Sequence, residues 1–326
     1  MNSRSPLAER VPRLWTLWAA ARPSQVALIL LVYVLGVGMA TTGSPVTRQC
    51  SSVSSVGELT ALQTLTPILV GGLALVPAAV SIHYANEYVD VETDAMTNRT
   101  PFSGGSGALD RTGLPAAFLR SATVASLGVT ALTVAVIAGT GTLSPPSIVI
   151  LVSILLAGLA YSLPPLAFIR RGVGELINAS LGGLLLPLYG AATIGRPTVT
   201  AALAVLPFTL VVGCNLLATH WADREADRSV GKRTLAVRLS TVSLRRLYVV
   251  LSVAAGAATV LVWITGAIPT AVALAHLAPV PILVWGGSVL TRQHSPLPSV
   301  LAMVVLALST TIAWWAVGIG LLGFSY

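Results

Sequence analysis

The sequence predicts an all-α polytopic membrane protein, and composition and hydropathy both indicate that class. Hydrophobic residues make up 55% of the 326-residue chain and charged residues only 9%, with a mean hydropathy of +0.84. A soluble domain carries roughly a quarter charged residues, so this chain has too little charge to cover a water-facing surface. The composition excludes a soluble enzyme, a disordered scaffold and a secreted module held together by disulfides; two cysteines form no such framework.

Long runs without Asp, Glu, Lys or Arg predict the membrane-spanning helices, because a helix needs about 20 apolar residues to cross the hydrocarbon core. Five runs suit one span each: 23–47, 59–86, 176–195, 197–222 and 293–326.

Two further runs, 121–169 and 247–291, are too long for one span. Turn signals at Gly139–Pro146 and Gly266–Pro269 divide each of them into two helices. The sequence therefore predicts nine transmembrane helices in a single domain over residues 1–326. A polar N-terminal segment (1–22) and a connector on the outer side (42–63) complete it.

The basic residues predict the orientation of these helices. With the N-terminus inside, only Arg48 and Arg196 of the 19 Lys and Arg residues fall on the outer side. Because cytoplasmic loops are enriched in Lys and Arg, we expect a cell-membrane protein whose N-terminus and main polar loops are cytoplasmic. The basic residues form no basic face, so no nucleic-acid partner is expected.

Seven of the 11 carboxylates fall in two short clusters at cytoplasmic helix ends. The cluster after the second span contains Asn86, Asp90 and Asp94, and the cluster after the sixth contains Asp223 and Asp227. Residues four apart lie on one helix face, so each cluster presents a row of oxygen ligands. The alternative is a pair of solvated helix ends that form salt bridges with local arginines.

Oxygen ligands on two facing helix ends repel one another without a cation, and carboxylate and amide oxygens suit Mg²⁺. Nearby basic side chains suited to phosphate oxygens are Arg99, Lys232 and Arg233. Glu87 and Glu92 are expected to point away from the ligand face and to be solvated.

The two clusters also resemble each other. His83-Tyr-Ala-Asn-Glu-Tyr-Val-Asp90 aligns with His220-Trp-Ala-Asp-Arg-Glu-Ala-Asp227, four helices later. An even number of helices preserves orientation, so the match predicts a parallel repeat. We expect two pseudo-repeated four-helix bundles followed by a ninth helix.

These motifs and this topology resemble the UbiA superfamily of intramembrane prenyltransferases, which carries N-D-x-x-D-x-x-x-D after helix 2 and D-x-x-x-D after helix 6. Here N-E-x-x-D-x-x-x-D runs from Asn86 to Asp94, with Glu87 where Asp is usual. The segments Tyr161–Pro165 and Arg170–Glu175 are similar to the family's connection between helices 4 and 5.

Within the superfamily, Phe102–Gly107 and Val230–Arg238 resemble the MenA-type dihydroxynaphthoate prenyltransferases of menaquinone synthesis. Those enzymes often carry an Asn pair just before the second motif, where this chain has Thr219 and His220.

The resemblance implies Mg²⁺-dependent transfer of a polyprenyl group from an allylic diphosphate to an aromatic acceptor, with dihydroxynaphthoate expected. The residues implied to bridge two Mg²⁺ ions are Asn86, Asp90, Asp94, Asp223 and Asp227. The expected contacts to the diphosphate are Asn86, Arg99, Lys232, Arg233, Arg170 and Arg171.

The implied catalytic residues are Asp90, Asp223 and Tyr161. Tyr161 would stabilise the allylic cation with its ring or position the diphosphate with its hydroxyl; an interfacial tyrosine is the alternative. His83 and His220 are candidates to contact the acceptor or to act as a base, and helix packing is the alternative for both.

Three other functions share some of these features. A UbiA-type terpene cyclase would use the same diphosphate without an acceptor, and the motifs do not separate it from a transferase. An ion-coupled transporter usually places its acids near the bilayer midplane on broken helices, whereas these lie at helix ends. A lipid head-group transferase would carry D-x-x-D-G-x-x-A-R, which does not occur here.

Overall fold

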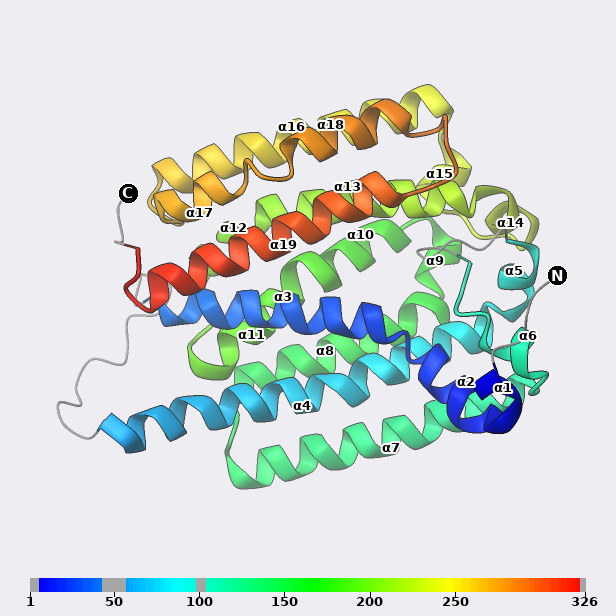
Figure 1. Cartoon of the computed structure of the whole chain (residues 1–326), viewed down its shortest axis with the longest axis horizontal. Coiled ribbons are helices and arrows are strands. Elements are labelled where there is room, and N and C mark those ends of the chain that lie inside the picture. Colours follow the sequence, from blue (N-terminus) through cyan, green and yellow to red (C-terminus); the bar gives the residue numbers. More distant parts are fainter. Residues whose placement is uncertain (1–5, 43–56, 98–103, 323–326) are drawn as a thin grey trace.

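The computed structural model describes residues 6–42, 57–97 and 104–322, and this part of the chain consists of helices and turns without a β-strand. Long helices run side by side along one axis, with most of the short helices gathered at one end (Figure 1). The long elements are α3 (Pro23–Thr41), α4 (Gly57–Val89), α7 (Ala116–Thr140), α8 (Pro145–Ser162), α13 (Leu206–Ala222), α16 (Thr241–Ile264) and α19 (Leu297–Gly318).

Two more crossings are built from shorter pieces. One comprises α10 (Gly174–Ala179), the π-helical turn η1 (Ser180–Leu185) and α11 (Leu186–Ile194); the other comprises α17 (Thr270–Ala275) and α18 (Val280–Val289). In the described residues, eight segments are long and apolar enough to cross a membrane.

The polytopic helical class is thus confirmed, while the predicted count of nine depends on α13. This apolar helix has 17 residues and is shorter than the other spans. It is preceded by α12 (Val199–Ala204), and a single residue, Val205, separates the two helices.

The turn signals divide the two long apolar runs as predicted, because α7 ends at Thr140 and α16 ends at Ile264. Helix α4 begins at Gly57, within the predicted connector 42–63, and residues 43–56 lie outside the described part.

Small residues let the central helices approach closely. A Cβ on Gly36 of α3 would lie 1.9 Å from the Pro187 carbonyl oxygen of α11, and one on Gly190 would lie 2.1 Å from the Tyr33 carbonyl oxygen. Such contacts are typical of packing between membrane helices, where dispersion replaces the hydrophobic effect. Helix α3 also packs against α19, which joins the two ends of the chain in one bundle.

The N-terminal segment folds against the bundle. Helices α1 (Pro6–Arg10) and α2 (Pro12–Ala20) pack on α6 (Ala108–Thr112), where the Thr16 and Thr112 hydroxyls lie 2.9 Å apart. Trp15 is buried there, while Leu14 and Trp18 are exposed. An amphipathic helix with exposed Leu and Trp is suited to lie in the membrane interface.

Candidate active site

Both acidic clusters occupy the same kind of hinge. Helix α4 ends at Val89, Asp90 has φ −92° and ψ 8°, and α5 (Val91–Met96) follows. Helix α13 ends at Ala222, Asp223 has φ −97° and ψ 5°, and α14 (Arg224–Ser229) follows. In each hinge the amide four residues later donates to the aspartate carbonyl, at 2.8 Å for Asp94 and 2.9 Å for Asp227. The first Asp of each D-x-x-x-D therefore ends a long helix and the second lies on a short one.

This geometry changes the predicted register of the repeat. The backbone pairs Asp90 with Asp223 and Asp94 with Asp227, one helical turn away from the alignment that began at His83 and His220. The two histidines are consequently not equivalent. The Nδ1 atom of His83 lies 2.8 Å from the Ala21 carbonyl oxygen, so this side chain joins α4 to the N-terminal segment.

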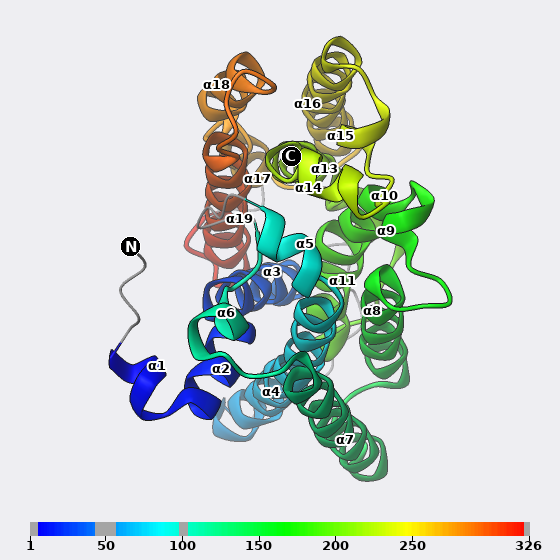
Figure 2. The same cartoon turned by 90° about the vertical axis from the view of Figure 1, so that its right-hand side faces the viewer.

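The two clusters meet at one end of the bundle, where α5 packs against α14 (Figure 2). Lys232 lies between them: its Nζ atom is 2.9 Å from Asp90 Oδ1 and 3.5 Å from Asp227 Oδ1. Both Lys232 and Asp227 are buried. Burial disfavours the ammonium, but the Asp90 and Asp227 carboxylates outweigh it and raise the pKa of Lys232, so the side chain is positively charged at neutral pH.

Asp94 combines partial burial with negatively charged neighbours. Burial and the neighbouring Glu87 and Asp90 carboxylates raise the pKa of Asp94 to about 7. Its carboxylate also touches the glycine-rich loop of residues 104–107, because a Cβ on Gly105 would lie 1.8 Å from Asp94 Oδ2. Gly105 has φ +70°, a conformation that glycine adopts without strain. Only glycine therefore lets this loop close on Asp94.

A divalent cation fits this donor set. The Oδ1 atom of Asn86 is buried without a hydrogen-bond partner, one turn before Asp90, and burial also raises the pKa of Asp227 despite Lys232. Hard oxygen atoms with excess negative charge are the ligands that Mg²⁺ takes. Among the described residues, no three Asp, Glu, His or Cys side chains form a metal-ligand group by themselves. A cation here would thus need the Asn86 oxygen, water or a substrate oxygen as well.

Glu87 is not solvated, contrary to the prediction. It is buried and accepts hydrogen bonds from Arg22 Nε at 2.8 Å, from the Ser106 amide at 2.8 Å and from the Ser106 hydroxyl at 2.7 Å. The side chain thus ties the N-terminal segment and the glycine-rich loop to the end of α4. Glu92, in contrast, is exposed as expected.

Glu175 lies beside the second acidic cluster, as Glu87 lies beside the first. Its Oε1 atom lies 2.9 Å from His220 Nδ1 and also accepts from the Leu235 amide. His220 Nε2 in turn lies 3.3 Å from the Tyr161 hydroxyl. A carboxylate accepts only, so Nδ1 carries the hydrogen, and Nε2 of the neutral ring accepts from the tyrosine. All three side chains are buried, which makes Tyr161–His220–Glu175 one chain of hydrogen bonds across α8, α13 and α10.

The segment that carries Lys232 is held from both sides. Thr234 caps α15 (Leu235–Arg238), the Arg233 amide donates to the Ile169 carbonyl at 3.2 Å, and Arg170 donates to the Val230 carbonyl at 2.8 Å. These contacts join it to α9 (Phe168–Arg171). The local fold therefore fixes the lysine backbone before any substrate arrives.

The other predicted phosphate ligands lie differently. The Arg170, Arg171 and Arg233 side chains are exposed, and Arg171 donates to the Pro165 carbonyl at 2.7 Å. Arg99 lies outside the described residues. Of the four predicted basic diphosphate ligands that the structure describes, Lys232 is the one brought against the acidic clusters.

Sequence reasoning missed the anchoring roles of Glu87 and Glu175. The available signal was the burial cost of a carboxylate next to a membrane span, which requires a partner. Arg22 and Ser106 were the partners for Glu87, but neither is near it in sequence.

Comparisons with known proteins identify the family and the fold. The UbiA prenyltransferase family matches residues 51–299. The chain therefore belongs to the UbiA prenyltransferase family, and its enzyme class is prenyltransferase. No curated protein matches it in sequence.

Three solved structures share the fold. A UbiA homologue from Archaeoglobus fulgidus bound to DMAPP and Mg²⁺ is 14% identical, with a TM-score of 0.64, covering 94% of this chain and 99% of its own. A digeranylgeranylglyceryl phosphate synthase is 13% identical, with a TM-score of 0.61 and coverages of 93% and 99%. A UbiA homologue from Aeropyrum pernix K1 is 15% identical, with a TM-score of 0.57 and coverages of 88% and 96%.

Proposed function

We propose that this protein transfers a polyprenyl group from an allylic diphosphate to an aromatic acceptor, with dihydroxynaphthoate as the acceptor. The observation that carries the proposal is Lys232, buried between Asp90 and Asp227 where the two acidic motifs meet. A diphosphate needs metal ligands on both sides and a positive charge that contacts it directly. The two acidic clusters supply the ligands, and the buried lysine between them supplies the charge.

We infer that Asn86, Asp90, Asp94, Asp223 and Asp227 hold two Mg²⁺ ions with the diphosphate, in line with the Archaeoglobus homologue that binds DMAPP and Mg²⁺. When bound, Mg²⁺ supplies Lewis-acid neutralisation of the leaving diphosphate. Lys232 then donates to a diphosphate oxygen and stabilises the charge that develops as the allylic C–O bond breaks. The loop at Gly105, anchored through Glu87, covers Asp94 and limits the access of water.

Tyr161 contributes its ring in this proposal. The hydroxyl lies 3.3 Å from His220 Nε2 and is engaged by that histidine, so the electron-rich ring face is assigned to stabilise the allylic cation. Glu175 orients His220, which holds the tyrosine in place.

The acceptor proposal depends on the loop after the second motif. The segment Val230–Arg238, which resembles that of dihydroxynaphthoate prenyltransferases, is the segment that carries Lys232. His220 stands where such enzymes often have Asn, and the structure uses it to hold Tyr161.

We also propose that the active-site end faces the cytoplasm. The short helices α5, α6, α9, α14 and α15 all lie at this end of the bundle (Figure 1), and their segments contain most of the basic residues between spans. That asymmetry is typical of cytoplasmic loops.

The test is a product assay on the full chain in lipid nanodiscs with Mg²⁺ and geranylgeranyl diphosphate, with and without dihydroxynaphthoate. Mass spectrometry should detect prenylated naphthoate only in the tube with acceptor, and excess EDTA should stop its formation. A hydrocarbon or terpene alcohol formed without acceptor would identify a cyclase instead. Diphosphate release that persists in excess EDTA would contradict the metal site.

A further inference from the structure

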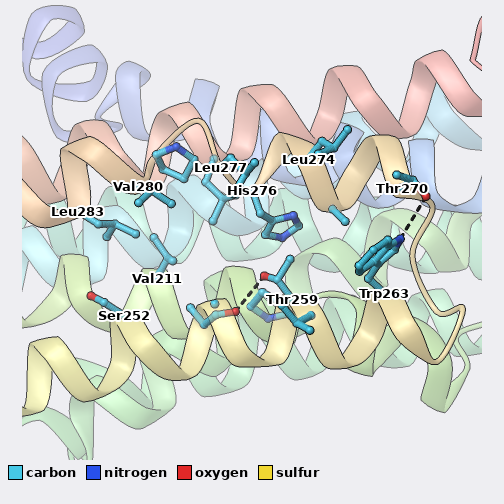
Figure 3. Close-up of a pocket in the computed structure, with 17 residues that line it drawn as sticks. Val211, Ser252, Thr259, Trp263, Thr270, Leu274, His276, Leu277, Val280 and Leu283 are labelled. Carbon is cyan, nitrogen blue, oxygen red and sulfur yellow. Dashed lines mark hydrogen bonds between the residues drawn. The ribbon is translucent and has the colours of Figure 1, made fainter. Parts of the chain in front are cut away.

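A second cavity lies away from the active site, between α13, α16, α17, α18 and α19. Its volume is about 440 Å³, within the range of small-molecule sites, which is roughly 300–1,000 Å³. Its walls include Val211, Val260, Leu274, Leu277 and Val280 (Figure 3). Helix α17 lies at the opposite end of the bundle from α5 and α14 (Figure 1), so this cavity is separate from the acidic clusters.

A break in a membrane-crossing segment lines this cavity. Helix α17 ends at Ala275 and α18 begins at Val280, although the two form one crossing of 20 residues. In the break, the His276 and Leu277 amides donate three residues back, to the Ala273 and Leu274 carbonyls at 3.2 and 3.0 Å. Irregular backbone at membrane depth is tolerated where it is buried in protein or lines a cavity. Residues of this break, His276, Leu277 and Pro279, form part of the cavity wall.

His276 is the polar side chain that this break presents. Its Nδ1 atom lies 2.8 Å from the Val272 carbonyl oxygen. A carbonyl only accepts, so Nδ1 carries the hydrogen and Nε2 of the neutral ring has a free lone pair. No hydrogen bond from a described residue reaches Nε2, and Figure 3 shows the ring within the cavity, between α17 and α16. A titratable side chain inside a membrane span marks a functional site by default.

The Thr259 hydroxyl leaves an acceptor rather than a donor in the cavity. The Thr259 hydroxyl donates to the Ala255 carbonyl at 2.9 Å, and the Trp263 indole donates to the Thr270 hydroxyl oxygen at 3.1 Å. Thr259 and His276 can therefore accept a hydrogen bond in the cavity, while their own hydrogens are committed. A ligand that satisfies these groups must supply the donor.

We propose that this cavity binds a lipid alcohol, whose chain packs against the apolar walls and whose hydroxyl donates to His276 Nε2. A purely apolar chain would leave the imidazole lone pair unsatisfied, and a lipid ether or ester carbonyl would bring a second acceptor to it. The site is additional to the proposed prenyl-transfer site and does not depend on it.

The test compares matched ligand pairs on the full chain in detergent micelles, by equilibrium binding of isotope-labelled probes. Geranylgeraniol and its methyl ether form one pair, and dioleoylglycerol and its methyl ether form the other. The alcohol should bind roughly fivefold more tightly than its ether, since one net hydrogen bond is worth about 1 kcal/mol. The pair that shows this preference identifies an isoprenoid or a glycerolipid as the source.

Two variants locate the binding. His276→Leu removes the acceptor and should abolish the preference for alcohol over ether, whereas Val280→Trp fills the cavity from its exposed lip and should weaken both probes. Diphosphate release at the active site, assayed in parallel, should stay unchanged in both variants and shows that each is folded. Equal binding of alcohol and ether by the wild-type protein would overturn the proposal, as would an alcohol preference that survives His276→Leu or binding that survives Val280→Trp.

Discussion

The Lys232 ammonium lies 2.9 Å from Asp90, although the two residues belong to opposite halves of the chain. Asp90 directly follows α4, and Lys232 follows α13 after the hinge at Asp223. Their contact joins the two D-x-x-x-D motifs into one site, with Asp227 on the other side of the lysine. The acidic clusters alone would repel each other, so the lysine holds this end of the bundle together in the absence of substrate.

Replacing Lys232 should remove a positive charge that stabilises the leaving diphosphate. In Lys232→Met we expect kcat to fall by roughly 100-fold or more, the usual cost of removing one preorganised charge from a transition state. Arg228→Ala is the matched control, because Arg228 is an exposed basic residue on the same segment that donates to the Val237 carbonyl. Steady-state kinetics on both variants would show the contrast. A similar fall in kcat in both variants would mean that positive charge on this segment, rather than the contact of Lys232 with the acidic clusters, supports turnover.

The aspartates at the hinges should be indispensable. Asp90→Asn and Asp223→Asn each remove a proposed cation ligand and should abolish turnover while the protein stays folded. Glu92→Gln, at an exposed position between Asp90 and Asp94, should remain close to wild type. Product formation and thermal unfolding would be measured together. Near-normal activity in either Asn variant would rule out the assignment of the metal ligands.

Gly105 should tolerate no side chain. A Cβ there would lie 1.8 Å from Asp94 Oδ2, so Gly105→Ala must push the loop or Asp94 aside, and turnover should fall sharply. Gly113→Ala is a close control, because Gly113 has the same φ of +70° but open space around it. Strain of about 1–3 kcal/mol is common to both variants. A difference in activity between them therefore reports the contact with Asp94, and equal activity would show that the loop does not close on it.

Tyr161 should act through its ring. Tyr161→Phe keeps the aromatic face and loses the hydrogen bond to His220, and we expect it to retain most of the activity. Tyr161→Leu removes the ring. Its kcat should fall much more than its KM for the substrate changes. The reverse order, with Phe as damaging as Leu, would assign the hydroxyl to catalysis.

Cation binding should strengthen as pH rises through neutrality. The pKa of Asp94 is raised to about 7 without a metal, so at pH 6 the carboxyl is largely protonated and must release a proton to bind a cation. At pH 8 it is already ionised. Mg²⁺ affinity, measured by calorimetry on the purified protein, should therefore be lower at pH 6 than at pH 8. Asp94→Asn should reduce that difference, and an unchanged pH dependence would point to another group.

The helices, the break points of the two long runs and the positions of the acids follow from the sequence alone. The lengths of charge-free runs decide where helices can cross, and each acid is a neighbour of its own span in sequence. The tertiary structure decided what these residues touch. Glu87 is buried against Arg22 and Ser106, Lys232 rather than the exposed arginines lies between the acids, and the His276 cavity forms between α16 and the broken α17–α18 crossing. These contacts join residues that are far apart in the chain, so they depend on which helices pack together, which no local pattern encodes.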